Sequence, residues 1–158
     1  MTDPVRVVIG ERSGAAPTVN QKLLYVGKEE GKILGLQQLY ATGLKTPALL
    51  FVQSKERAND LYMHLNALRS PVVVDVVHAD RSHAQREQAV KDFRSRRTWL
   101  LITTDLMARG LDFPAVKLVI NYDFPQSVIS YIHRIGRTGR AGREGEAVTL
   151  YTDSDLPS

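Results

Sequence analysis

Four arginines recur at every third position near the end of the sequence, with glycines between them and a histidine in front. Residues 133–145 read HRIGRTGRAGREG, which contains His133, Arg134, Arg137, Arg140 and Arg143. A guanidinium group stays charged and can bind two phosphate oxygens at once, and glycine lets the backbone approach a ligand closely. The pattern therefore fits a phosphate held near the main chain. It equally fits a helix end, which glycine terminates and arginine stabilises through the helix dipole.

A second stretch of similar composition lies about 25 residues earlier. Residues 107–112 read MARGLD and place Arg109, Gly110 and Asp112 soon after an apolar run. This combination suits a bound anion with a carboxylate beside it, because arginine supplies the charge and glycine the close approach. A tight turn capped by Asp112 explains the same residues, and the spacing alone does not separate the two interpretations.

The sequence lacks the motifs of several other kinds of catalytic or metal site. The chain contains neither G-x-x-x-x-G-K-[ST] nor G-x-S-x-G, so it shows no Walker A loop and no hydrolase nucleophile elbow. The stretch GKEEGK at residues 27–32 has the wrong spacing for such a loop and predicts the start of a helix. His78, Asp80 and His83 do not match a zinc spacing. We therefore expect no metal site.

The overall composition indicates an intracellular globular protein. The chain has 158 residues, enough for one domain with a substantial core, and it contains no cysteine, which fits a reducing compartment. No apolar run approaches the ~20 residues of a membrane span, and the first residues lack the apolar core of a signal peptide. The net charge of +4 allows an anionic partner without requiring one.

The elements that must position these residues follow a regular strand–helix alternation. Short apolar runs rich in β-branched residues predict buried strands at 22–26, 47–52, 71–77, 99–103, 117–122 and 146–151. Amphipathic segments at 29–42, 54–68 and 82–94 predict helices, the last two capped by Ser54 and Ser82. The alternation predicts an α/β fold with a mostly parallel sheet flanked by helices on both faces.

The strand ends of this sheet carry polar residues. Ligands of open α/β sheets gather at the carboxyl ends of the strands, where this sequence has QSK at 53–55, TTD at 103–105 and NYDFPQS at 121–127. The arginine motif instead follows a helix, which by the same rule should end toward the opposite edge of the sheet.

Several of these stretches, taken together, resemble a known family. HRIGRTGRAGREG and TTDLMARGLDFPAVKLVINYDFP at 103–125 closely resemble the second RecA-like domain of DEAD-box RNA helicases. LLFVQSKERA at 49–58 and HADRSHAQREQAVKDFR at 78–94 resemble further motifs of that family, in the family's order. FVQS and INYDFP are similar to the branch that acts in small-ribosomal-subunit assembly. The resemblance implies a RecA-like three-layer domain over residues 21–158, with residues 1–20 as an interdomain linker or tail.

The resemblance also implies roles in nucleotide chemistry. Arg137 and Arg140 match the arginines that reach across an interdomain cleft to the ATP phosphates, and His133 matches a residue that couples this motif to the other domain. Asp112 matches a ribose-contacting carboxylate, with Gly110 beside it in the nucleotide site. Arg134 and Arg143 would serve as supporting structure or as interdomain contacts.

RNA binding carries over to three other positions. Ser54, Arg86 and Thr104 match residues that touch the RNA sugar–phosphate backbone, so the binding expected is independent of base sequence. One departure is Ala79, which stands where the family commonly has glycine. It alters how closely that loop can approach RNA.

The resemblance further implies that this chain is half of an active site. The family's first domain carries the Walker A loop and the acidic residues that hold Mg²⁺ with ATP, and neither is present here. We therefore expect a monomeric domain, inactive alone, from an ATP-dependent RNA helicase that works with its first domain and with protein cofactors. Its location would be the nucleus or nucleolus if the source is eukaryotic, and otherwise the cytoplasm. A stand-alone RNA-binding module and a protein-interaction domain are the alternatives.

Overall fold

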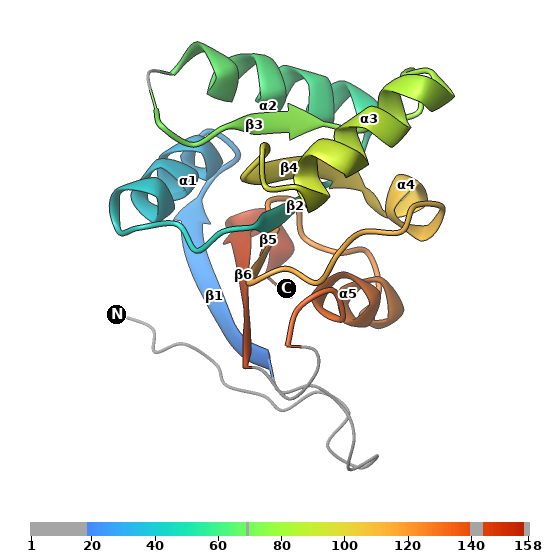
Figure 1. Ribbon diagram of the computed structural model, residues 1–158. Coiled ribbons are helices and arrows are strands. Elements are labelled where there is room, and N and C mark those ends of the chain that lie inside the picture. Colours follow the sequence, from blue (N-terminus) through green and yellow to red (C-terminus); the bar gives the residue numbers. More distant parts are fainter. Residues whose placement is uncertain (1–18, 69, 140–143, 157–158) are drawn as a thin grey trace.

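The computed structural model describes residues 19–68, 70–139 and 144–156, whose centre is a six-stranded sheet (Figure 1). Within these residues the strands pair in parallel, in the order β1-β6-β5-β2-β4-β3. The strands are β1 (Val19–Gly27), β2 (Ala48–Val52), β3 (Val74–Val76), β4 (Leu100–Thr104), β5 (Leu118–Asn121) and β6 (Gly145–Thr152). The predicted strand at 71–77 is shortened to three residues, and the other five predicted strands are confirmed.

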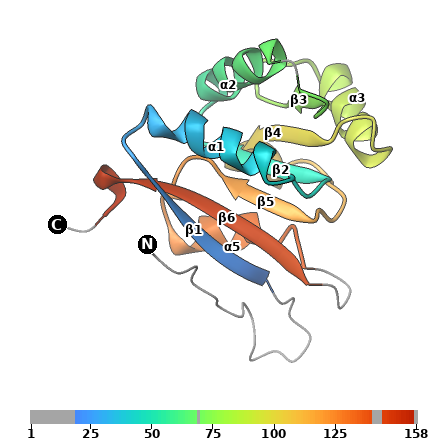
Figure 2. The same ribbon diagram turned by 90° about the vertical axis from the view of Figure 1, so that its left-hand side faces the viewer.

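Helices cover both faces of the sheet, as the alternation of elements predicted (Figure 2). They are α1 (Gly31–Ala41), α2 (Lys55–Ala67), α3 (His83–Arg94), α4 (Asp105–Arg109) and α5 (Val128–Ile135), and a 3₁₀ turn, η2, spans Asp153–Asp155. The helices α1 and α2 pack on one face against Leu50 and Ile120, whereas α3, α4 and α5 pack on the other against Leu49 and Phe51. The strands β2, β4 and β5 therefore contribute alternate side chains to two cores, one on each face of the sheet.

Local sequence signals set the beginnings of the helices. Ser54 accepts a hydrogen bond from the backbone of Arg57 and caps α2, and Ser82 forms a reciprocal capping box with Gln85 at the start of α3. Both predicted caps are confirmed. The stretch at 27–32 leads into α1, as predicted. No helix among the described residues is long and apolar enough to cross a membrane. The prediction for residues 1–20 lies almost entirely outside the described residues.

Candidate functional site

The short helix α4 is held at both ends by residues that the sequence had singled out. Thr104 is the last residue of β4, and its Oγ1 accepts a hydrogen bond from the Met107 backbone at 3.3 Å, which caps the helix. Near the other end, the Ala108 carbonyl accepts a hydrogen bond from Nη2 of Arg137 at 3.0 Å. A predicted RNA contact and a predicted phosphate contact thus attach to the same five-residue helix.

The three predicted RNA contacts lie around the carboxyl ends of neighbouring strands. Ser54 follows β2, and Val52 of that strand pairs with Thr104 of β4. Arg86 on α3 reaches toward the same helix, since its Nη1 lies 3.8 Å from the Met107 sulfur while its Nε donates to the Arg81 carbonyl at 3.0 Å. All three side chains are partly exposed. The structure therefore places Thr104 and Arg86 near α4, and Ser54 just beyond the end of the neighbouring strand β2.

Two residues of the arginine motif with predicted roles, Arg137 at the phosphates and His133 in coupling to the other domain, line the same small pocket between α4 and α5. The pocket has a volume of about 70 Å³ and is lined by Phe51, Asp105, Ala108, Arg109, Ile129, Ser130, His133, Arg134 and Arg137. His133 and Arg137 are therefore neighbours, and Arg109 adds a further cation. Arg140 and Arg143 lie outside the described residues.

Gly110 and Asp112 lie beyond the end of α4, and neither lines this pocket. Asp112 has a fully exposed side chain 3.8 Å from Nη2 of Arg94 and lines a separate groove beside α3. It is therefore accessible to a ligand. A Cβ added to Gly110 would meet only the Met107 carbonyl, at 3.8 Å, and the φ of this residue is −96°. The described fold thus gives no steric or conformational reason for glycine at this position.

The backbone of the arginine motif lies at the edge of the sheet expected for a segment that follows a helix, which is the edge opposite the carboxyl ends of the strands. The Arg137 side chain, however, reaches back to α4. Thr138 forms a parallel bridge with Val116, just before β5, and the Arg137 carbonyl accepts the Val116 N–H at 3.0 Å. The backbone therefore lies toward the amino-terminal edge of the sheet. The Arg137 side chain reaches Ala108 because α4 is only five residues long and the chain after it returns along the sheet to Val116.

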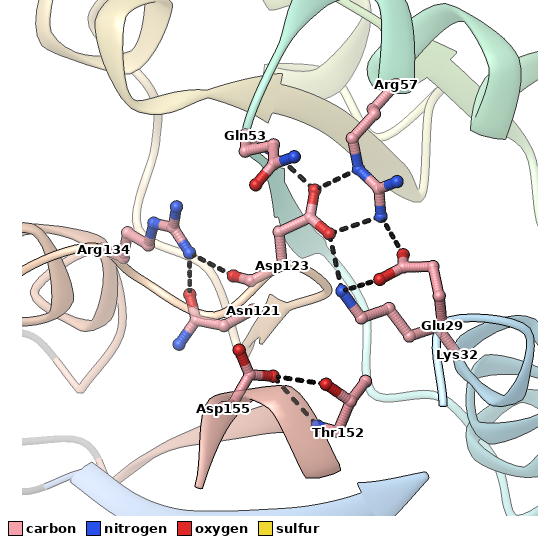
Figure 3. Close-up of polar contacts among 9 residues, drawn as sticks. All are labelled: Glu29, Lys32, Gln53, Arg57, Asn121, Asp123, Arg134, Thr152 and Asp155. Carbon is pink, nitrogen blue, oxygen red and sulfur yellow. Dashed lines mark hydrogen bonds and ion pairs between the residues drawn. The ribbon is translucent and has the colours of Figure 1, made fainter. Parts of the chain in front are cut away.

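Arg134 is the best-buried cation among the described residues and acts as supporting structure. Only 2% of its surface is exposed, and its Nε and Nη2 each donate to Asp105 at 2.8 Å. Its Nη1 donates to the Asp123 carbonyl at 2.7 Å and to the Asn121 side chain at 3.3 Å (Figure 3). This two-pronged pairing fixes α5 relative to α4 and leaves Arg134 no role as a mobile phosphate ligand.

A second ionic cluster lies behind Arg134 and connects it to the opposite face of the sheet. The Asp123 carboxylate accepts hydrogen bonds from Nε of Arg57 at 2.7 Å, from Nζ of Lys32 at 2.9 Å and from the Gln53 backbone at 2.8 Å (Figure 3). Glu29 pairs with both cations at the rim. Burial by itself would raise the pKa of Asp123, but the bonds from Arg57, Lys32 and Gln53 outweigh it and hold this pKa below its usual value.

Sequence reasoning assigned no role to the acidic members of these clusters. Asp105 and Asp123 stand in the polar stretches that follow β4 and β5, and that placement was the only signal for them. Their cationic partners Arg57, Lys32 and Arg134 come from three different helices. Nothing in the spacing of one sequence predicts which strand end meets which helix.

Comparison with known proteins identifies the family of the domain. Residues 31–142 match the model of the helicase conserved C-terminal domain. The chain is 57% identical over 157 residues to the "Probable ATP-dependent RNA helicase ddx52" of Dictyostelium discoideum and 49% identical over 156 residues to the ATP-dependent RNA helicase ROK1 of Scheffersomyces stipitis. These alignments cover 99% and 98% of the chain but only 23% and 28% of the relatives.

Solved structures of DEAD-box proteins share the fold. The yeast splicing factor Prp28 superposes with a TM-score of 0.79 at 34% identity, over 87% of this chain and 30% of that one. The C-terminal domain of the DEAD-box protein Dbp5 gives 0.72 at 38% identity, over 84% and 77%. The L327V variant of S. cerevisiae Dbp5, bound to RNA and ADP BeF3, gives 0.76 at 35% identity, over 94% of this chain and 37% of that one. The predicted RecA-like α/β architecture is thereby confirmed.

Proposed function

The chain belongs to the helicase conserved C-terminal domain family, in its DEAD-box branch, and on this premise we propose that Arg137 and Arg140 act on the phosphates of ATP bound to a separate first domain. A positioned guanidinium stabilises the negative charge that spreads over a phosphoryl group during transfer. His133, in the same pocket as Arg137, would contact the first domain as the cleft closes. The exposed Asp112 carboxylate would accept hydrogen bonds from the ribose, with Gly110 allowing close approach.

RNA would bind at the other end of α4. Ser54 and Thr104 offer hydroxyls and Arg86 a cation to the sugar–phosphate backbone, which carries no base identity. The observation that carries the proposal is the shared attachment of Thr104 and Arg137 to α4. A strand of RNA that shifts the start of this helix also shifts the carbonyl that holds the arginine. RNA binding and phosphate chemistry would therefore be coupled through the short backbone segment between Thr104 and Ala108.

The Mg²⁺ that accompanies ATP belongs, in this proposal, to the first domain. Within residues 19–68, 70–139 and 144–156, no three His, Cys, Asp or Glu side chains gather in a way that could hold a metal ion. Mg²⁺ would neutralise phosphate charge from the opposite side of the cleft. Toward the phosphates themselves, the described residues of this chain would contribute cationic side chains, Arg137 above all.

The RNA substrate that we propose is a precursor of the small ribosomal subunit. The support is the resemblance of FVQS and INYDFP to the branch that acts in its assembly, and a eukaryotic protein of this branch would work in the nucleolus. Flanking segments or protein cofactors would select the substrate, because the contacts assigned to this domain do not read bases.

The function is tested by measuring phosphate release from ATP with the chain alone and with the chain joined to a cognate first domain. We expect no RNA-stimulated turnover from the chain alone, because the phosphate cradle is missing, and turnover from the joined protein. Turnover by the purified chain alone would reveal a nucleotide site within it and would overturn the half-site proposal. A joined protein that folds and binds RNA but never hydrolyses ATP would support the RNA-binding alternative.

The proposed contact of Arg86 with RNA is tested separately, by measuring how the RNA affinity of the joined protein depends on salt concentration. Arg86→Met keeps most of the aliphatic length but removes the charge, so the slope of log affinity against log salt should become shallower by about 0.7, the value for one single-strand phosphate contact. Arg97→Met is the control, since Arg97 is exposed and its nearest described carboxylate, Asp92, lies 3.7 Å away. An unchanged slope in a folded Arg86→Met protein would remove Arg86 from the interface.

A further inference from the structure

The outer side of α5 carries three exposed aliphatic residues that the fold does not use. Val128 is 73% exposed, Ile129 67% and Ile132 42%. We call these three residues the α5 ridge. The side of the helix opposite Ile129 is buried through Arg134 and packs against the core through Tyr131, so the orientation of α5 is fixed and its ridge faces solvent. β-Branched residues are mediocre helix formers, which makes them a poor choice for a helix face that only contacts water.

The ridge is continuous with the pocket that holds the predicted phosphate arginine. Ile129 and His133 are four residues apart on the helix and therefore neighbours on its surface, and both line the pocket with Arg137. A surface that contacts His133 from outside must also contact Ile129. On its other flank, Val128 borders an apolar groove that includes Leu23, Phe124 and Tyr131.

We propose that the α5 ridge is the hydrophobic contact between this domain and the first helicase domain of the same polypeptide, made when the cleft closes. The inference rests on the proposed function, because Arg137 can act on a nucleotide only if the other domain comes against the surface around it. The geometry therefore favours the first domain as the partner of the α5 ridge. The chain spans less than a third of the length of the relatives named above, and the rest of such a relative is long enough to contain this domain.

Burial of the ridge supplies an attraction that the cationic pocket cannot. Arg109, His133 and Arg137 surround the pocket with groups that favour a bound phosphate, so their attraction depends on the nucleotide. The aliphatic ridge favours contact with another apolar surface whatever the nucleotide state. The ridge therefore sets how readily the cleft closes, and the arginines make closure depend on ATP.

The test uses the two-domain protein with one fluorophore on each domain and measures the closed fraction by energy transfer, with RNA and a non-hydrolysable ATP analogue. Ile129→Ser should lower the closed-to-open ratio about tenfold, as expected for losing the burial of one large aliphatic side chain, and raise the RNA concentration needed for half-maximal ATP turnover. Leu34→Ser is the matched control. Leu34 is 61% exposed on α1, on the opposite face of the sheet, and its change should leave closure unaltered.

Two results would overturn the inference. The first is an unchanged closed fraction in a folded Ile129→Ser protein. The second is loss of self-association, measured by light scattering, without any loss of closure, which would assign the ridge to a second copy of the chain. Arg137→Ala, measured in parallel, separates this failure from failure of the proposed function. If it abolishes turnover while Ile129→Ser changes nothing, only the ridge assignment fails.

Discussion

Replacing Arg137 by alanine should lower the RNA-stimulated ATP turnover of the two-domain protein by about 10³-fold or more, the range in which arginine fingers of other nucleotide hydrolases contribute. The side chain is already oriented, because its Nη2 donates to the Ala108 carbonyl. The cation therefore needs little reorganisation when a phosphate arrives, and this preorganisation is where electrostatic catalysis gains its effect. Turnover is measured at saturating ATP and RNA, so that weakened binding does not account for the loss.

Two further variants make this result specific. Arg137→Lys keeps one positive charge but not the planar fork, and should recover only part of the rate. Arg97→Ala removes an exposed arginine from the region after α3 and should leave turnover within about twofold, as for a surface substitution away from the site. Wild-type turnover by a folded Arg137→Ala protein would contradict the assignment. A loss confined to the Michaelis constant for ATP would make Arg137 a binding residue only.

Replacing Asp123 by asparagine should destabilise the domain by about 3 kcal/mol, because it leaves buried positive charge without its main partner. Lys32 is only 5% exposed, and Arg57 makes two bonds to the same carboxylate. Glu29 remains near both cations, which keeps the loss at the lower end of the range for broken buried pairs. Urea unfolding of the domain at pH 7 measures the change.

Repeating the urea unfolding at low pH tests whether the negative charge of Asp123 causes the loss of stability. The folded-state pKa of Asp123 is lower than its unfolded value, so its contribution is fully present above about pH 4 and is lost as the pH falls through the folded pKa. The stability difference between wild type and Asp123→Asn should therefore shrink below pH 4. Asp80→Asn, which alters an exposed carboxylate paired with Lys55, should cost less than about 1 kcal/mol. A difference that persists undiminished at pH 2 would point to packing instead of charge.

The fold could be predicted from the sequence because its signals are local. Runs such as ALLFV at 48–52 are typical of strands buried on both faces of a parallel sheet, and Ser54 and Ser82 cap helices through bonds to residues three positions away. The prediction was least accurate for the longest run, 71–77, of which Val74–Val76 form the strand, although Val73 and Val77 also make backbone hydrogen bonds to the residues of and beside β4. This strand lies at one edge of the described sheet, where it has a single neighbour.

The sequence could nominate site residues only where a residue's type and motif indicate its task. Arg137, His133 and Thr104 were nominated in this way, and their roles stay predictions; the structure places His133 and Arg137 in one pocket and Thr104 at the start of α4. Asp123 was not nominated, since an aspartate after a strand serves equally as a ligand, a cap or a counter-ion. Its role depends on Lys32 and Arg57, which reach it across 91 and 66 residues of chain. Such long-range pairing depends on the tertiary fold, so it cannot be predicted from the residue pattern of a single sequence.

The pairing of β1 with β6 has a consequence for synthesis of the protein. Among the strands that the structure describes, β1 lies at an edge and pairs with β6 alone, and Lys22 on β1 meets Glu146 on β6 across 124 residues of chain. At translation rates of about 5–20 residues per second, β1 leaves the ribosome on the order of ten seconds before its partner exists. During that interval its apolar residues, including Leu23 and Tyr25, have no strand to pair with. We expect the nascent domain to depend on chaperones in this window, and its final folding step to be the insertion of β6 between β1 and β5.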